Sequence, residues 1–95
     1  MATVRLTRAA VDDLDELIVS HELPGDTPRR IRARLRSVGR FPRMGRQLDG
    51  VWAGTRYLLG PWPWLVIVYE YDEVRDAVTV LTIQDARRGS SPTVR

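Results

Sequence analysis

The segment Trp64-Leu-Val-Ile-Val-Tyr-Glu-Tyr71, with Ala77-Val-Thr-Val-Leu-Thr-Ile83 after it, is the strongest structural signal in this chain. Both runs are rich in β-branched and aromatic residues, which favour strands, and the turn-prone residues 72–76 separate them. A third β-rich run, Gly54-Thr-Arg-Tyr-Leu-Leu-Gly60, precedes them across the Pro-containing turn at residues 60–63. Together the three runs predict an antiparallel meander.

Two helices are expected upstream of these strands. Apolar residues recur at helical spacing through residues 8–22, with acidic residues on the other face, and predict a first helix there. Thr27 and Pro28 then offer a hydroxyl N-cap and a proline in the first turn of a second helix, which Gly39 is expected to end. Ahead of both helices, the alternating segment Thr3-Val-Arg-Leu-Thr7 predicts a short strand.

The order strand, helix, helix, strand, strand, strand predicts an α+β fold. In this fold an N-terminal strand precedes an antiparallel helical hairpin. The hairpin is expected to pack as a second layer on one face of the three-stranded antiparallel meander and to leave the other face of the sheet uncovered. At 95 residues the chain is expected to form a single domain over residues 1–88. Residues 89–95 combine turn formers with few apolar side chains and predict a flexible tail, and residues 41–53 predict the crossover from the helices to the sheet.

Composition excludes several classes of function. The chain has no cysteine, which removes disulfides, thiolate zinc sites and cysteine nucleophiles. Its longest apolar run is interrupted by Pro63 and is far shorter than the about 18 residues of a membrane span, and the N-terminus lacks a signal pattern. No Gly-rich phosphate loop or Walker motif is present, so nucleotide hydrolysis is excluded. We expect a cytoplasmic protein without a membrane partner, metal or cofactor.

Charge is distributed unevenly along the chain. All 15 basic residues are arginine, which can reflect a GC-rich codon bias or phosphate recognition. Residues 29–48 hold eight arginines and no acid, and such a segment attracts acidic proteins or nucleic-acid backbones. On the second helix the apolar stripe leaves four arginines on the opposite side: Arg29, Arg32, Arg36 and Arg40. They either form salt bridges with the acids of the first helix or contact a ligand directly.

Other residues also have a structural and a functional interpretation. Arg43 and Arg46 lie in the crossover and are further candidates for binding a partner. Arg56 is predicted on a strand, from which it can reach across the exposed sheet face toward residues 87–88 and clamp a phosphate or an acidic surface. Trp62 lies in a turn and is expected to be an exposed interface anchor, whereas the lone His21 is expected to be a surface residue.

Several short motifs occur in a characteristic order along almost the whole chain. They are Leu6-Thr-Arg-Ala-Ala10, Asp13-Leu14, Arg30-Ile31, Phe41-Pro-Arg-Met-Gly-Arg46, Gly54-Thr-Arg56, Val68-Tyr69, Leu81-Thr-Ile83 and Asp85-Ala-Arg-Arg88. In order and spacing the chain resembles the RelE/ParE superfamily of toxins from bacterial type II toxin–antitoxin systems, and the crossover motif is the most specific. The crossover and C-terminal motifs are closer to the ParE, or plasmid stabilisation, branch.

The resemblance implies a toxin that inhibits growth and is neutralised by a cognate antitoxin, an acidic segment that folds on binding. ParE-like members poison DNA gyrase. RelE-like members are ribosome-dependent endoribonucleases that cleave mRNA. Here Val66 stands where RelE-like enzymes place an arginine, and Gln84 stands near the position of a histidine in other members. We therefore expect a gyrase inhibitor rather than an enzyme.

Two alternatives remain open. If the protein is a nuclease, its catalytic candidates are Arg56, Tyr57, Arg87 and Arg88, although unshifted arginines cannot serve as a general base. The chain could instead be an inactive, Arg-rich binding homologue that attracts nucleic acid by counterion release.

Overall fold

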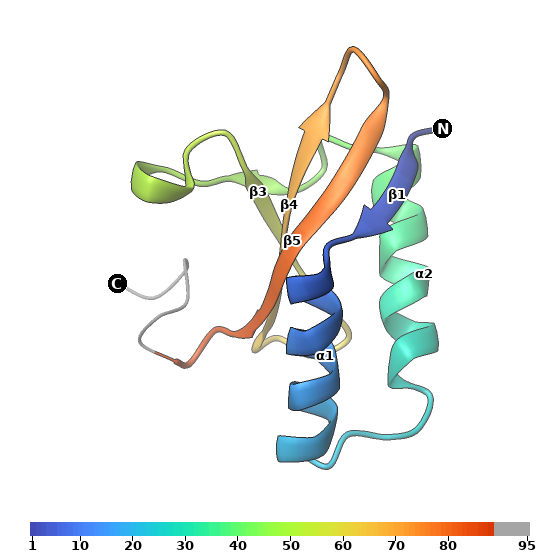
Figure 1. Ribbon diagram of the computed structural model, residues 1–95, viewed down its shortest axis with the longest axis vertical. Helices are drawn as coiled ribbons and strands as arrows, with labels where there is room; N and C mark the ends of the chain where they lie inside the picture. Colours follow the sequence, from blue (N-terminus) through green and yellow to red (C-terminus); the bar gives the residue numbers. More distant parts are fainter. Residues whose placement is uncertain (89–95) are drawn as a thin grey trace.

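The computed structural model describes residues 1–88 and contains the predicted elements in the predicted order (Figure 1). The elements are β1 (Thr3–Leu6), α1 (Arg8–Ser20), α2 (Thr27–Arg40), β2 (Arg46–Gln47), the 3₁₀ turn η1 (Gly50–Trp52), β3 (Arg56–Leu59), β4 (Leu65–Asp72) and β5 (Ala77–Asp85). The tail predicted for residues 89–95 lies outside the described residues. Within residues 1–88, no helix has the length and apolar character required to cross a membrane.

The strands form one five-stranded sheet in the order β1-β5-β4-β3-β2. The predicted meander is confirmed, since β3, β4 and β5 pair antiparallel in succession. The N-terminal strand joins the same sheet, where β1 pairs with β5 in parallel, from Thr3 opposite Ala77 to Leu6 opposite Val80. Strand β2 lies within the segment predicted as a crossover, and its two exposed residues carry no hydrophobic pattern that indicates a strand.

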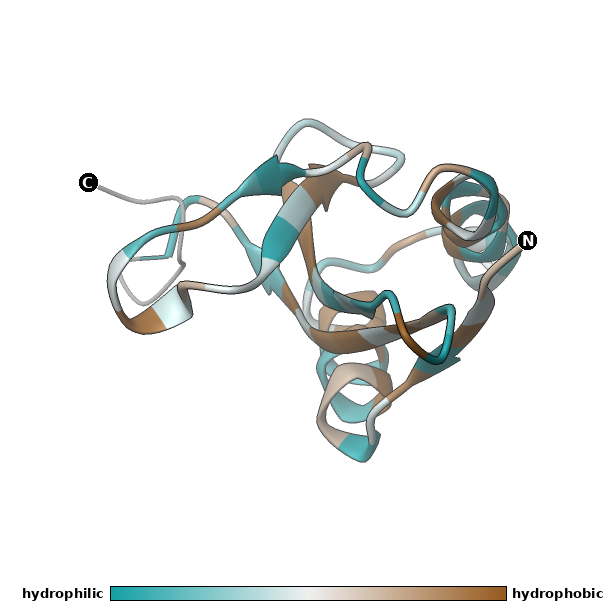
Figure 2. Ribbon diagram, turned by 90° about the horizontal axis from the view of Figure 1, so that it is seen from above, coloured by the Kyte–Doolittle hydropathy of each residue, from teal (hydrophilic) through white to brown (hydrophobic). Residues whose placement is uncertain are grey.

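The core is built from one face of the central strands and from both helices. In β4 the side chains of Leu65, Ile67 and Tyr69 are fully buried in this core, to which α1 and α2 contribute their apolar stripes. Figure 2 shows that the most hydrophobic stretches lie on the central strands. Each helix makes its main contacts with a strand, α1 with β5 and α2 with β1, rather than with the other helix.

Helix α1 follows the edge of β5 that β1 leaves unpaired. Strand β1 ends at Leu6, and the Thr7 hydroxyl then donates a hydrogen bond to the carbonyl of Leu81 at 3.0 Å. Nearly two turns further on, Asp13 Oδ2 accepts hydrogen bonds from the Thr82 hydroxyl at 2.6 Å and from the Ile83 backbone N–H at 3.2 Å. A helical side chain therefore satisfies a strand-edge donor that would otherwise need another strand.

The ends of the helices differ from the predictions by one or two residues. Asp26, not Thr27, occupies the N-cap position of α2, because Thr27 is fully buried and its hydroxyl donates to the carbonyl of Pro24 at 2.6 Å. Gly39 lies inside the last turn of α2 rather than ending it. A Cβ at this position would lie 3.3 Å from the carbonyl oxygen of Ala2, so a larger residue would fit only if β1 shifted slightly.

The second face of the sheet is not uncovered at its centre, contrary to the prediction. Val66 and Val68 alternate with the core residues of β4, point to the opposite face, and are also fully buried. Toward β3 this face is more open, since Tyr57 is half-buried and Leu59 is exposed.

Candidate functional site

The arginines of α2 form an exposed stripe that we call the α2 row: Arg29, Arg32, Arg36 and Arg40. The salt bridges expected between this row and the acids of α1 do not form among the described residues, and Asp12 pairs instead with Arg8 of its own helix. Arg29 has a 3.6 Å contact with Asp26, and the other three members of the row have no acidic partner within residues 1–88. The row is therefore available for an external anion.

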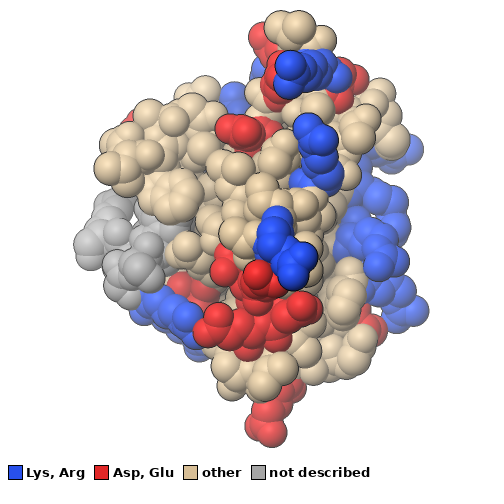
Figure 3. Space-filling view, viewed as in Figure 1, with Lys and Arg blue, Asp and Glu red and all other residues tan. Residues whose placement is uncertain are grey.

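The acidic side chains of α1 and the arginines of α2 lie on different sides of the molecule. Figure 3 shows acidic groups gathered over α1 near the centre of the view and arginines along the side formed by α2. The field of the protein therefore attracts an anionic partner toward α2 and repels it from α1.

Arg56 does not form the predicted clamp with Arg87 and Arg88. It lies opposite Tyr69 on β4, whereas Asp85, just before the other two arginines, lies opposite Leu65, about 13 Å away along the strand. The half-buried Arg56 guanidinium donates to the carbonyls of Arg43 at 3.2 Å and Gly45 at 2.9 Å. Its observed contacts hold the crossover loop, and Arg87 and Arg88 lie at the other end of the sheet.

Tyr69 is the second anchor of the crossover. Its side chain is fully buried, and its hydroxyl donates to the carbonyl of Pro42 at 2.8 Å and accepts from the backbone N–H of Gly45 at 2.9 Å. Desolvation raises the pKa of Tyr69 above its usual range, although the hydrogen bond from Gly45 and the charge of Arg56 act in the opposite direction. The crossover carrying the candidates Arg43 and Arg46 is thus fixed to the sheet.

Arg46 and Tyr57 face each other across two strands. They are register partners of β2 and β3, so their side chains project from the same face of the sheet. Arg56 and Tyr57 are sequence neighbours on one strand and point to opposite faces, so they cannot act on one substrate group. The sequence did not reveal this pair because β2 was not predicted. Arg43 instead forms an ion pair with Glu73 and lies over the Tyr71 ring.

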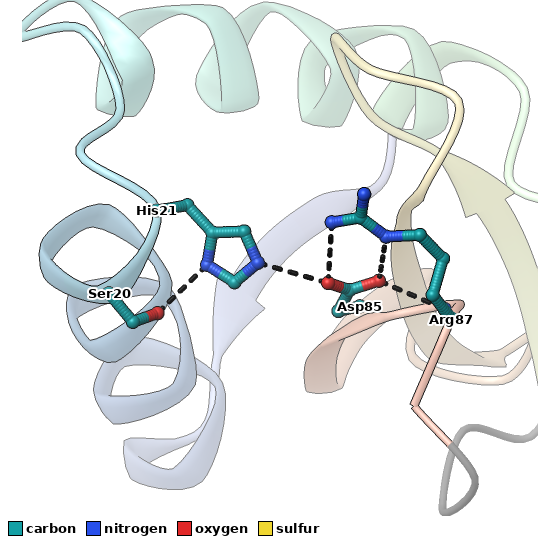
Figure 4. Close-up of polar contacts among 4 residues, drawn as sticks. All are labelled: Ser20, His21, Asp85 and Arg87. Carbon is teal, nitrogen blue, oxygen red and sulfur yellow. Dashed lines mark hydrogen bonds and ion pairs between the residues drawn. The ribbon is translucent and has the colours of Figure 1, made fainter.

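His21 belongs to a polar cluster rather than to the free surface (Figure 4). Its Nδ1 lies 2.8 Å from the Ser20 hydroxyl and its Nε2 lies 3.0 Å from Asp85 Oδ2, and only 21% of its side chain is exposed. Arg87 donates to both oxygens of Asp85, at 2.9 and 2.8 Å. These Arg87 hydrogen bonds, with a smaller effect of His21, hold the pKa of Asp85 far below its usual range. The cluster ties the end of α1 to the end of β5.

Trp62, predicted as an exposed interface anchor, is half-buried. Its ring stacks on Trp64 at 5.8 Å between centroids, and the Arg30 guanidinium lies 5.9 Å from the centroid of the Trp62 ring. Trp64 in turn stacks on His21 at 4.8 Å and lies under the guanidinium of Arg87. These stacked side chains connect both helices to the turn before β4. They are Arg30, Trp62, Trp64, His21 and Arg87.

Within residues 1–88, no group of three or more histidine, cysteine, aspartate or glutamate side chains is arranged to hold a metal ion. The described residues offer the cations of the α2 row, the Arg46–Tyr57 pair on the sheet, and two structural anchors. The anchors are the contacts of Arg56 and Tyr69 with the crossover and the cluster of His21, Asp85 and Arg87. Its chemistry is that of anion binding.

Comparisons with known proteins identify relatives by structure. No family model matches the chain, and no curated protein matches it. A chain of the toxin–antitoxin complex RelBE2 from Mycobacterium tuberculosis is 28% identical, with a TM-score of 0.61, covering 88% of this chain and 96% of that one. The isolated E. coli RelE toxin is 15% identical, with a TM-score of 0.69 and coverages of 95% and 89%.

A metal-bound toxin from Helicobacter pylori is also similar in fold, at 15% identity and a TM-score of 0.69, covering 90% of this chain and 94% of that one. The structural neighbours are thus RelE- and RelBE-type toxins, which match the α+β architecture with its two helices and mixed five-stranded sheet. They support the RelE/ParE toxin superfamily for this chain and do not distinguish its ParE branch from its RelE branch.

Proposed function

We propose that this protein is the toxin of a type II toxin–antitoxin system and that it inhibits growth by poisoning DNA gyrase. The neighbours support the toxin–antitoxin role, because they include toxin–antitoxin complexes and isolated toxins. The choice of gyrase rests on one observation. Val66, which stands where RelE-like enzymes place an arginine, is fully buried and lies opposite Gln84, so this pair offers neither a cation nor an imidazole for RNA cleavage.

The proposed antitoxin contributes an acidic segment that binds at the α2 row. Arg32 and Arg36 border a groove whose floor is formed by Leu35 of α2 and by Val4 and Leu6 of β1. A segment that alternates apolar and acidic side chains matches this combination of an apolar floor and a cationic rim. The electrostatic part of the interaction accelerates association and weakens with salt.

A supercoiling assay tests the proposed target. Purified protein is incubated with gyrase, ATP and relaxed plasmid, and both supercoiled product and protein-trapped linear DNA are measured. Loss of supercoiling with trapped linear DNA is the expected result. The same protein unfolded by heat is the control. Folded protein that leaves supercoiling unchanged at a large molar excess over gyrase contradicts the proposal.

The alternative function, ribosome-dependent cleavage of mRNA, is favoured by the Arg46–Tyr57 pair alone. The pair supplies a cation and a phenol on one face of the sheet. If the protein acts in this way, Arg46→Ala and Tyr57→Phe abolish growth inhibition, and cleaved mRNA accumulates only in the presence of ribosomes. A gyrase poison retains supercoiling inhibition in the Tyr57→Phe variant.

A further inference from the structure

We propose that the α2 row binds the phosphate backbone of a DNA duplex, so that the toxin contacts the DNA held by its target as well as the target protein. This inference rests on the proposed function and names the second partner of the same molecule. It is carried by the spacing of the row, by the lack of acidic partners for three of its four arginines within the described residues, and by the small amount of open aromatic surface beside it.

The row matches a regular line of phosphates. Arg29, Arg32, Arg36 and Arg40 follow one another at three or four residues, which places their Cα atoms about 4.5–6 Å apart along the axis of an α-helix. The four positions lie within one exposed stripe of the helix, and the buried Ile31, Leu35 and Val38 lie outside it. Their side chains are long enough to adjust to neighbouring phosphates, and the row spans about 16 Å.

The cations of the row are free to exchange water and salt ions for phosphates. The neighbouring arginines of α2 are occupied, since Arg30 binds Asp26 at 3.0 Å and Arg34 donates to the carbonyl of Leu59 at 3.0 Å. Arg32, Arg36 and Arg40 have no such partner among residues 1–88. Binding to DNA therefore releases counterions without breaking an ion pair of these three residues.

The aromatic residues favour a duplex over a single strand. Proteins that hold single strands stack the bases on open aromatic rings. Here Trp62 and Trp64 stack on each other, and Arg30, Arg87 and His21 occupy further positions against their rings. Near the row, Phe41 is a 65% exposed aromatic ring, and it lies just past the last turn of the helix. The surface offers phosphate contacts in a line and little base stacking.

The acidic antitoxin segment proposed above would then neutralise the toxin by occupying the duplex site. This gives the row two anionic partners that exclude each other. DNA binding without gyrase is the direct test, because it does not depend on the identity of the antitoxin or of the target enzyme.

The experiment measures the fluorescence anisotropy of a labelled 20-base-pair duplex titrated with the full chain at 50–200 mM NaCl. With four phosphate contacts, the plot of log affinity against log salt has a slope of about −3.6, so the affinity falls on the order of 100-fold over this range. The variant Arg32→Gln/Arg36→Gln/Arg40→Gln is expected to flatten the slope by about 3 and to weaken binding at 50 mM salt by about tenfold or more.

A matched control separates the row from net charge. The variant Arg5→Gln/Arg8→Gln/Arg75→Gln removes the same three charges at exposed positions outside α2 and should keep the wild-type slope. Circular dichroism melts establish that both variants are folded. A single Arg36→Glu variant repeats the test with one substitution, and its affinity should fall by about tenfold at 50 mM salt, since it loses one cation and adds a repelling charge.

Three results overturn the proposal: no binding of the duplex by folded wild-type protein at 50 mM salt, equal losses in the row and control variants, or tighter binding of a single-stranded RNA of the same length. The last result would assign the row to RNA. A protein that poisons gyrase but ignores free duplex refutes only this inference. A protein that binds duplex through the row but leaves gyrase active refutes only the proposed target.

Discussion

The substitution Tyr69→Phe tests how the crossover loop is attached to the sheet. It removes one oxygen atom from a fully buried ring and keeps the ring's packing, so its effect isolates the hydroxyl. That hydroxyl satisfies two backbone groups, the carbonyl of Pro42 and the N–H of Gly45. The variant leaves both groups without this partner, and the N–H of the buried Gly45 loses most because water does not replace the bond easily.

The expected loss follows from these two contacts. A buried polar group left unsatisfied costs about 1–3 kcal/mol, and the half-buried carbonyl of Pro42 lies at the lower end of that range. We expect Tyr69→Phe to reduce the free energy of unfolding by about 2–4 kcal/mol. For a domain of this size, that change lowers the melting temperature by about 10–25 °C.

Urea unfolding at pH 7, followed by circular dichroism, measures this loss directly. Tyr57→Phe is the matched control, because the Tyr57 hydroxyl has no hydrogen-bond partner among residues 1–88, and its effect should stay within about 0.5 kcal/mol. Since burial raises the pKa of Tyr69, the wild-type protein also loses stability as the pH rises above about 10, where the unfolded tyrosine ionises first. Equal losses in the two Tyr→Phe variants at pH 7 would refute the reasoning.

Three further substitutions address separate contacts. Gly45→Ala should destabilise the protein by about 1–3 kcal/mol or more in urea unfolding, because its Cβ would lie 2.6 Å from the Tyr69 hydroxyl oxygen and 2.8 Å from the Tyr57 carbonyl oxygen; an unchanged midpoint would contradict this geometry. Asp85→Asn should make the free energy of unfolding less dependent on pH. Because the pKa of Asp85 is lower in the folded than in the unfolded protein, the ionised carboxylate stabilises the fold fully above about pH 4, near the pKa of the unfolded chain. This stabilisation is lost as the pH falls from there toward the pKa of the folded protein. Parallel wild-type and variant stability curves between pH 6 and pH 2 would show that Asp85 does not contribute in this way. Asp13→Ala should cost about 1–2 kcal/mol and speed hydrogen exchange at the Ile83 N–H, whereas Asp12→Ala, on the exposed side of the same helix, should change neither.

The sequence predicted the elements whose patterns are local. The buried run of β4, the alternation of β5 and the apolar stripes of both helices correspond to the observed elements within two residues. Strand β2 could not be predicted in this way, because its two exposed residues are held by pairing with β3 rather than by any preference of their own. The parallel pairing of β1 with β5 joins residues 74 positions apart and leaves no local signal either.

The candidate site was also predicted only where its pattern is local. The α2 row follows from helical periodicity and is observed as an exposed stripe, although its expected salt bridges with α1 are absent from the described residues. Arg56 was assigned to the wrong face because its partners, the carbonyls of residues 43 and 45, belong to a loop whose position no pattern indicates. His21 and Asp85 meet only after the whole chain has folded, so a lone histidine gave no indication of its buried partner.

The position of β5 at the centre of this mixed sheet has a consequence for synthesis in the cell. Strand β5 is made after the four other strands of the sheet, yet β1 and β4 both pair with it and α1 lies along its edge. At elongation rates of about 5–20 residues per second, β1 waits about 4–15 s for its partner, since Thr3 pairs with Ala77. A nascent chain therefore cannot complete its sheet before β5 leaves the ribosome, and only after that point can a partner that recognises the finished fold bind it.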